Sequence, residues 1–159
     1  MVWSTKYWGR EFNIKFDIQV TKELSSSSSS SYMNVFHITQ GGDYSSYGDR
    51  IPAVWTKKTS YKTYVYVMSA VSGDKNYYKY FECELNQWYH FEIKQEENSN
   101  GEIIYSIKID GHTVHEVVNT TPQRFKEVIL YESDPWYESF ASFGELKHLK
   151  IVNSEKDHH

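Results

Sequence analysis

Two glutamates spaced two residues apart are the side chains best placed for acid–base chemistry. Glu82 and Glu84 would share one face of an extended strand with Tyr78 and Tyr80, and their backbones would lie roughly 6.5–7 Å apart. Cleavage of a glycosidic bond needs two carboxyl groups, one as acid and one as base or nucleophile. The spacing therefore allows a glycoside hydrolase or lyase that uses Glu82 and Glu84.

The other potentially catalytic residue types form no recognisable pattern. The chain has no Gly-x-Ser-x-Gly elbow and no Gly-rich phosphate loop. His112-x-x-His115 has no nearby cysteine or carboxylate that would complete a set of zinc ligands. The sequence therefore favours a binding module without catalytic residues, and the two glutamates remain the enzymatic alternative.

Aromatic and charged residues in two polar loops form the predicted binding site. An aromatic ring can stack on the apolar face of a sugar, and protein interfaces use the same residue types as anchors. Gly41–Asp49 and Ser133–Trp136 are rich in turn residues. The predicted ligand-binding residues are Asp43, Tyr44, Tyr47, Asp49, Arg50, Trp55, Asp134, Trp136 and Tyr137. Core packing remains the alternative for Trp136.

The same loops also contain oxygen ligands that a metal ion could use. Calcium takes several oxygen ligands from flexible loops, and Asp43 and Asp49 share one loop while Asp134 lies in the other. The chain has no Asp-x-Asp-x-Asp-Gly run of the EF-hand type. We therefore expect no cofactor, with calcium at the rim as the alternative and its ligands undefined.

The elements that must position these residues are strands. In Trp88–Gln95 and in Phe12–Val20, apolar residues alternate with polar ones, which is typical of a half-buried antiparallel strand. Further strands are expected at Met33–Thr39, Ala53–Thr56, Tyr61–Ala70, Tyr77–Leu85, Glu102–Asp110, Val114–Val118, Val128–Glu132 and Leu146–Val152. A short turn of helix at Gln123–Glu127 is the most helix that the sequence allows. About ten strands indicate an antiparallel sandwich.

Turn and core residues complete this expectation. Asn98–Gly101 and Asp110-Gly111 supply residues that tolerate positive φ, as β-hairpins require. Phe81, Cys83 and Leu85 would point into the core, which makes Cys83 a buried, unreactive thiol. Trp88 is expected to be a structural core residue.

Length and charge limit the function classes. The chain has 159 residues and a net charge of -4, with no basic block, so nucleic acid is not an expected partner. No apolar run approaches the roughly 20 residues that span a bilayer. We expect one domain over residues 1–152, an exposed serine-rich connection at 25–31 and a tail at 153–159, whose His158-His159 is typical of a tag remnant.

One set of motifs resembles a known superfamily. The order Asn86-x-Trp88-Tyr-His90-Phe-x-Ile93, followed by Tyr105-x-Ile107-x-Ile109-Asp110-Gly111, is similar to the concanavalin A-like lectin and laminin-G-like superfamily. With compatible flanking strands, the resemblance covers most of Glu11–Val152. It implies a jelly-roll sandwich of two curved antiparallel sheets.

The resemblance also implies a range of functions. Members bind carbohydrates or cell-surface and matrix proteins in cell adhesion, some with calcium, and some hydrolyse polysaccharides. Jelly-roll glucanases carry Glu-x-Asp-x-x-Glu on one strand, whereas Gln87 occupies the third acidic position here. We therefore predict a non-catalytic, extracellular binding module that recognises a carbohydrate or a cell-surface or matrix protein. A self-associating matrix protein is a further alternative, and the single cysteine and the lack of a visible signal peptide leave the cytoplasm open.

Overall fold

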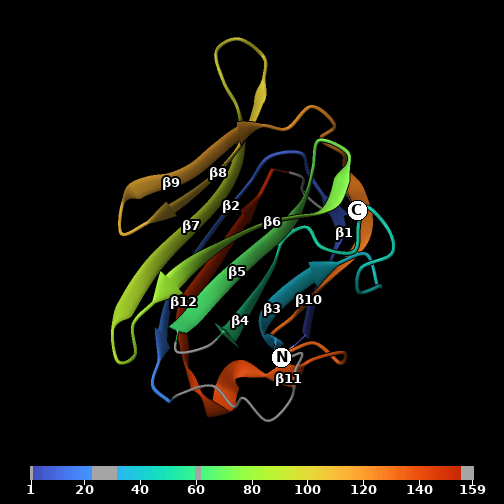
Figure 1. Ribbon diagram of the computed structural model, residues 1–159. Coiled ribbons are helices and arrows are strands. Elements are labelled where there is room, and N and C mark those ends of the chain that lie inside the picture. The colour runs from blue at the N-terminus through green and yellow to red at the C-terminus, as the bar shows by residue number, and fades with distance from the viewer. Residues whose placement is uncertain (1, 23–31, 60–61, 155–159) are drawn as a thin grey trace.

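The alternating apolar residues of the chain pair into two β-sheets that face each other (Figure 1). The computed structural model describes residues 2–22, 32–59 and 62–154. Within these ranges it has twelve strands, one short 3-10 helix and no α-helix. The prediction of an antiparallel jelly-roll sandwich with about ten strands is confirmed.

The first sheet has seven strands in the order β1-β10-β3-β4-β5-β6, and the two-residue β11 also pairs with β3. All its pairs are antiparallel except β11 with β3. Its strands are β1 (Val2–Trp8), β3 (Tyr32–Thr39), β4 (Ala53–Thr59), β5 (Lys62–Val71), β6 (Asp74–Cys83), β10 (Phe125–Tyr131) and β11 (Glu138–Ser139).

The second sheet has five antiparallel strands in the order β12-β2-β7-β8-β9. They are β2 (Phe12–Val20), β7 (Trp88–Glu97), β8 (Ile103–Ile109), β9 (His112–Val118) and β12 (Gly144–Asn153), and the helix η1 (Phe140–Ser142) precedes β12. Asp110 and Gly111 join β8 to β9 with φ values of 51° and 84°, so the predicted hairpin turn is confirmed.

Aromatic rings fill the space between the sheets. Phe16 of β2 meets Phe36 of β3 edge-on at 5.2 Å between ring centroids, and Phe81 of β6 meets Phe91 of β7 at 6.2 Å. Such edge-to-face contacts add to the free energy of burial. The predicted alternation therefore places these apolar rows in the core.

Several local predictions were wrong. Gln123–Glu127 holds no helical turn, because Phe125 starts β10 and pairs with Trp8 of β1. Long-range pairing thus overrides the local sequence, and the same pairing makes Val2–Trp8 an unpredicted strand.

The end of β6 and the start of β7 also differ from the prediction. Because β6 ends at Cys83, Leu85 lies in the following turn and is exposed. Trp88 is also exposed, and the ammonium of Lys147 lies 5.0 Å from its ring centroid. Cys83 is buried as predicted, and burial raises the pKa of its thiol to about 12.

The predicted serine-rich connection, the predicted tail and the predicted domain bounds are not tested by the described part of the structure. The serine run at residues 25–31 and the tail residues 155–159 lie outside the described residues, and the single domain over 1–152 stays a prediction. No helix in the described ranges has the length and apolar character needed to cross a membrane.

Candidate ligand-binding site

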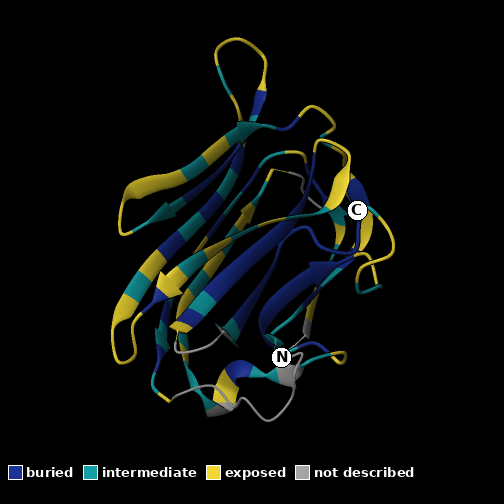
Figure 2. Cartoon of the chain, viewed as in Figure 1, coloured by how far each residue is buried: buried dark blue, intermediate teal, exposed yellow. Residues whose placement is uncertain are grey.

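Strands β3, β4 and β5 are buried on both faces, as the dark blue strands of the first sheet show (Figure 2). One face meets the core, and the other carries a separate apolar cluster. Ala53, Trp55, Tyr66 and Met68 form this outer cluster, and Tyr32, Tyr64 and Tyr137 pack against it. An apolar cluster on the outer face of a sandwich would be exposed to solvent, and here loops and aromatic side chains shield it.

Four tyrosines extend the cluster towards the edge of the sheet. We call Tyr64, Tyr66, Tyr78 and Tyr80 the tyrosine face. The rings of Tyr66 and Tyr80 are near-parallel at 5.2 Å, and those of Tyr78 and Tyr80 at 6.4 Å. Burial raises the pKa of Tyr66, whereas Tyr78 and Tyr80 are 52% and 54% exposed. The face thus offers two accessible rings on a packed aromatic base.

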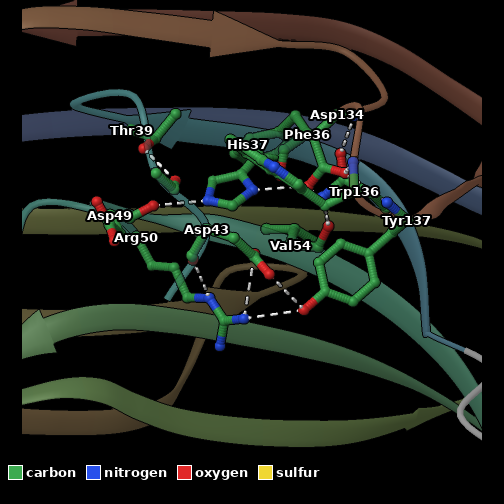
Figure 3. A network of polar contacts seen from close by, with 12 residues as sticks. Phe36, His37, Thr39, Asp43, Asp49, Arg50, Val54, Asp134, Trp136 and Tyr137 are labelled. Carbon is green, nitrogen blue, oxygen red and sulfur yellow. Dashed lines mark hydrogen bonds and ion pairs between the residues drawn. The ribbon is translucent and has the colours of Figure 1, made fainter. Parts of the chain in front are cut away.

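A buried histidine ties the adjoining loops to the sheet (Figure 3). The Nδ1 atom of His37 lies 2.6 Å from an oxygen of Asp134, and Nε2 lies 2.6 Å from the carbonyl oxygen of Asp49. Both partners are acceptors, so both bonds form when each ring nitrogen carries a proton. We therefore interpret His37 as an imidazolium paired with the carboxylate of Asp134.

Asp134 in turn fixes the loop that follows β10. Its second carboxylate oxygen accepts hydrogen bonds from the backbone N–H groups of Trp136 and Tyr137, at 3.0 and 2.9 Å. This is the local turn that aspartate favours. The turn places the Trp136 ring against His37 and the Tyr137 ring against Trp55, with centroids 5.4 and 5.5 Å apart.

Arg50 lies between the loop that carries Tyr137 and the tyrosine face. Its guanidinium stacks over Trp55, 4.7 Å from the ring centroid, and donates to the Asp43 carboxylate and the Tyr137 hydroxyl. The Tyr137 hydroxyl also donates to Asp43 at 3.1 Å. Burial raises the pKa of Tyr137 to about 12. We call Asp43, Arg50 and Tyr137 the arginine cluster.

The fold brings most of the predicted binding residues together. Seven of the nine lie together: Arg50 itself and six residues around Arg50 and His37, with the ring of Tyr44 6.0 Å from the guanidinium carbon. They are Asp43, Tyr44, Arg50, Trp55, Asp134, Trp136 and Tyr137. Trp55 is buried beneath the others, whereas Tyr44 and Trp136 are exposed.

The fold places Tyr47 and the Asp49 side chain elsewhere. Tyr47 packs against the core near Phe125, and its hydroxyl bonds to Thr121. The Asp49 carboxylate accepts the backbone N–H of Ser46 within its own loop. Both side chains hold the loop in shape and face away from the arginine cluster.

Residues that were not predicted as binding residues include His37 and the tyrosine face. A histidine between Phe36 and Ile38 in an apolar strand was the available signal for His37. Tyr78 and Tyr80 were expected on one sheet face, but as neighbours of the Glu82 and Glu84 pair, and Tyr64 and Tyr66 were not assigned to that face.

That carboxylate pair does not lie on one strand. Glu82 is on β6, 3.5 Å from the ammonium of Lys62, whereas Glu84 follows the end of β6. Both are exposed and border a shallow hollow of about 220 Å³. Because the strand ends at Cys83, the expected same-strand spacing is wrong, although Glu82 does share the outer face with Tyr78 and Tyr80.

Among the residues that the structure describes, one group of side chains could hold a metal ion. Ligand atoms of His37, Asp43 and Asp134 lie within 4.8 Å of one another. However, both ring nitrogens of His37 already form hydrogen bonds, and the Asp43 carboxylate already accepts hydrogen bonds from Arg50 and Tyr137. Asp49, the third residue of the expected calcium set, directs its carboxylate into its own loop. A cation would have to displace these contacts and lie beside a guanidinium.

A larger hollow of about 540 Å³ lies between β3 and β12. Its lining includes Ser133, Ser139 and Gly144, its phenyl ring, Phe140, is buried, and its exposed imidazole, His148, is bonded to Asp17. It therefore lacks the accessible tyrosine rings that the tyrosine face offers.

The outer face of the second sheet carries a different polar cluster. Asp17 accepts hydrogen bonds from Nδ1 of His90 and of His148, each at 2.6 Å. The bonds from His148 and His90 lower the pKa of Asp17 below its ordinary 3.8. His148 reaches Asp17 from an irregular position in β12, with a φ of 57°.

This cluster predicts a pH-dependent contribution to stability. A lowered pKa in the folded state stabilises the fold above the unfolded pKa near 3.8, and the contribution is lost as pH falls through the lower folded value. We expect Asp17→Asn to lower the free energy of unfolding at about pH 6 and to have little effect at about pH 2. Urea unfolding at both pH values checks this, and an equal effect at both would contradict it.

Comparison with known proteins identifies the fold. No protein-family model and no curated protein sequence matches the chain. Among solved structures, a SAP-like pentraxin from Limulus polyphemus has a TM-score of 0.58 at 13% identity, over 93% of this chain and 65% of the pentraxin. An alginate lyase from Pseudomonas aeruginosa has a TM-score of 0.57 at 12% identity, over 94% of this chain and 68% of the lyase.

A glucuronan lyase from the fungus Trichoderma reesei gives a TM-score of 0.53 at 11% identity, over 94% of this chain and 71% of the lyase. The chain thus has a concanavalin A-like jelly-roll fold, which is compatible with carbohydrate binding. It spans 65% of the length of the pentraxin. At these identities the likeness concerns the fold alone.

Proposed function

We propose that the protein is a non-catalytic carbohydrate-binding module whose ligand lies on the tyrosine face beside the arginine cluster. The observation that carries this proposal is the pair of exposed rings, Tyr78 and Tyr80. Met68, which pairs with Tyr78, contacts Arg50, and Arg50 binds the partly buried carboxylate of Asp43. Stacking on a ring removes the apolar face of a sugar from water. A carboxylate held in a fixed position then accepts hydrogen bonds from the sugar hydroxyl groups that flank that face.

The rigidity of the site supports binding. Arg50 and Asp134 hold Asp43 and the Tyr137 loop through partly buried hydrogen bonds, so little ordering is needed when a ligand arrives. Exposed aromatic side chains beside an ordered polar network are typical of binding hot spots.

The burial and hydrogen bonding of the candidate catalytic residues argue against a polysaccharide lyase or hydrolase. A general base must reach the proton it removes, yet His37 is wholly buried with both nitrogens engaged. The hydroxyl proton of Tyr137 is donated to Asp43, and the raised pKa opposes its loss. Glu82 and Glu84 border one hollow, but Glu84 lies beyond the end of β6, so the two carboxylates are not held on one strand face.

Calorimetric titration with a panel of hexasaccharides tests the proposal. The panel comprises β-1,4-linked glucose, mannose and galactose, β-1,3-linked glucose, and the uronic acid forms of the first three. We expect at least one to bind the wild type without turnover, and Tyr80→Ala to weaken that binding by about 2 kcal/mol, or about 30-fold.

Trp88→Ala is the matched control, because Trp88 is an exposed aromatic residue on the second sheet. It should leave binding unchanged. Failure of the whole panel to bind, or equal binding by the wild type and Tyr80→Ala, would overturn the proposal.

A further inference from the structure

The guanidinium of Arg50 has no hydrogen-bond donor left for a ligand. Arginine has five N–H groups, and Arg50 makes five bonds. Nε donates to the Asp43 carbonyl oxygen at 2.9 Å, Nη1 to the Met68 sulfur at 3.1 Å and the Asn76 amide oxygen at 3.3 Å, and Nη2 to the Asp43 carboxylate at 3.3 Å and the Tyr137 hydroxyl at 3.0 Å. Arg50 therefore supports the site and is not free to bind an anionic group.

The charges beside the Tyr137 loop are paired with one another. The Asp43 carboxylate is bonded to the Arg50 guanidinium, and an oxygen of Asp134 lies 2.6 Å from Nδ1 of His37. The ammonium of Lys57 lies 4.4 Å from the ring centroid of Tyr32.

The site offers acceptors where a ligand would meet it. Asp43 uses one carboxylate oxygen for Arg50 and the other for Tyr137, and an ionised carboxylate has about four acceptor positions. Two positions therefore remain for hydroxyl donors. A carboxylate on the ligand would instead lie near the Asp43 carboxylate, and Arg50 has no donor left to pair with it. Burying an unpaired charge is costly.

We propose that the site is specific for neutral glycans over uronates, with Asp43 as the specificity-determining residue that neutralises Arg50. This inference rests on the proposed function and names the ligand class of the same surface. The chain's net charge of -4 acts in the same direction, because it repels polyanions.

Matched hexasaccharides test the inference. β-1,4-linked mannose and mannuronate differ only at C6, where one has a hydroxymethyl group and the other a carboxylate, and glucose and glucuronate form a second pair. We expect the wild type to bind the neutral member of a pair about tenfold or more tightly than its uronate. Its affinity for the neutral member should change little between low and high salt, because that ligand carries no charge for salt to screen.

Asp43→Asn should alter this preference. The substitution keeps an oxygen for Arg50 but removes the charge that balances it, so the ratio of neutral to uronate affinity should fall about tenfold. Uronate binding by this variant should weaken as salt is added. Glu82→Gln is the control, because its ion pair with Lys62 is exposed, and it should keep the wild-type ratio.

The outcomes separate the two proposals. Binding that depends on Tyr80 but favours uronates, or a ratio that Asp43→Asn leaves unchanged, would overturn the neutral-glycan inference and leave the binding proposal standing. Binding by neither member of any pair, or binding that ignores Tyr80→Ala, would overturn both.

Discussion

Asp134→Asn is expected to lower the free energy of unfolding by about 3–5 kcal/mol, because it removes one partner of a buried charge pair. His37 and Asp134 have no exposed side-chain surface, and their atoms lie 2.6 Å apart. Asparagine keeps one acceptor oxygen where aspartate has two, so either His37 or the N–H groups of the following loop would face an amide N–H instead of an oxygen. The N–H groups of Trp136 and Tyr137 would also lose their charged acceptor. Urea unfolding at neutral pH measures the loss.

Two further variants make this result interpretable. Glu82→Gln breaks an exposed pair with Lys62 and should change stability by less than about 1 kcal/mol. If His37→Gln is combined with Asp134→Asn, the total loss should be smaller than the sum of the single losses, because the two residues act through one contact. Additive losses would contradict a direct pair.

Arg50→Lys is expected to weaken glycan binding about 30-fold while the protein still folds. Lysine keeps the charge but cannot reproduce a planar group that reaches Asp43, Asn76 and Tyr137 at once. The carboxylate and the Tyr137 ring would then be held less rigidly, and ordering them would reduce the binding free energy. Calorimetric titration with the tightest-binding hexasaccharide measures the change.

Arg10→Lys is the matched control, since Arg10 is exposed and is not among the residues of the site. It should bind as the wild type does. Unchanged binding by Arg50→Lys, with unchanged stability, would show that the arginine cluster does not support the ligand surface.

The sheet framework could be predicted because its information is local. The alternation in Phe12–Val20 and Trp88–Gln95 specifies which side chains face the core, and the two strands are neighbours with Phe16 opposite Phe91. Asp110-Gly111 specifies its turn through positive φ. The turn made by Asp134 also follows from the residue type.

The centre of the candidate site could not be predicted because its contacts are long-range. His37 and Asp134 are 97 positions apart, and β3 lies between β10 and β4 in the sheet. Tyr44 and Tyr47 are the same residue type in the same loop, yet Tyr44 lies near Arg50 and Tyr47 packs on the core. Loop backbone angles decide the direction of each side chain, and residue types alone do not fix them.

Amide chemical-shift mapping during titration of the wild type with the tightest-binding neutral hexasaccharide tests the central claim most directly. We predict that the largest shifts fall on β5, β6 and the segments 43–50 and 134–137, because these carry the tyrosine face and the arginine cluster. Shifts confined to the second sheet around Trp88, or to the hollow lined by Ser139 and Gly144, would contradict it.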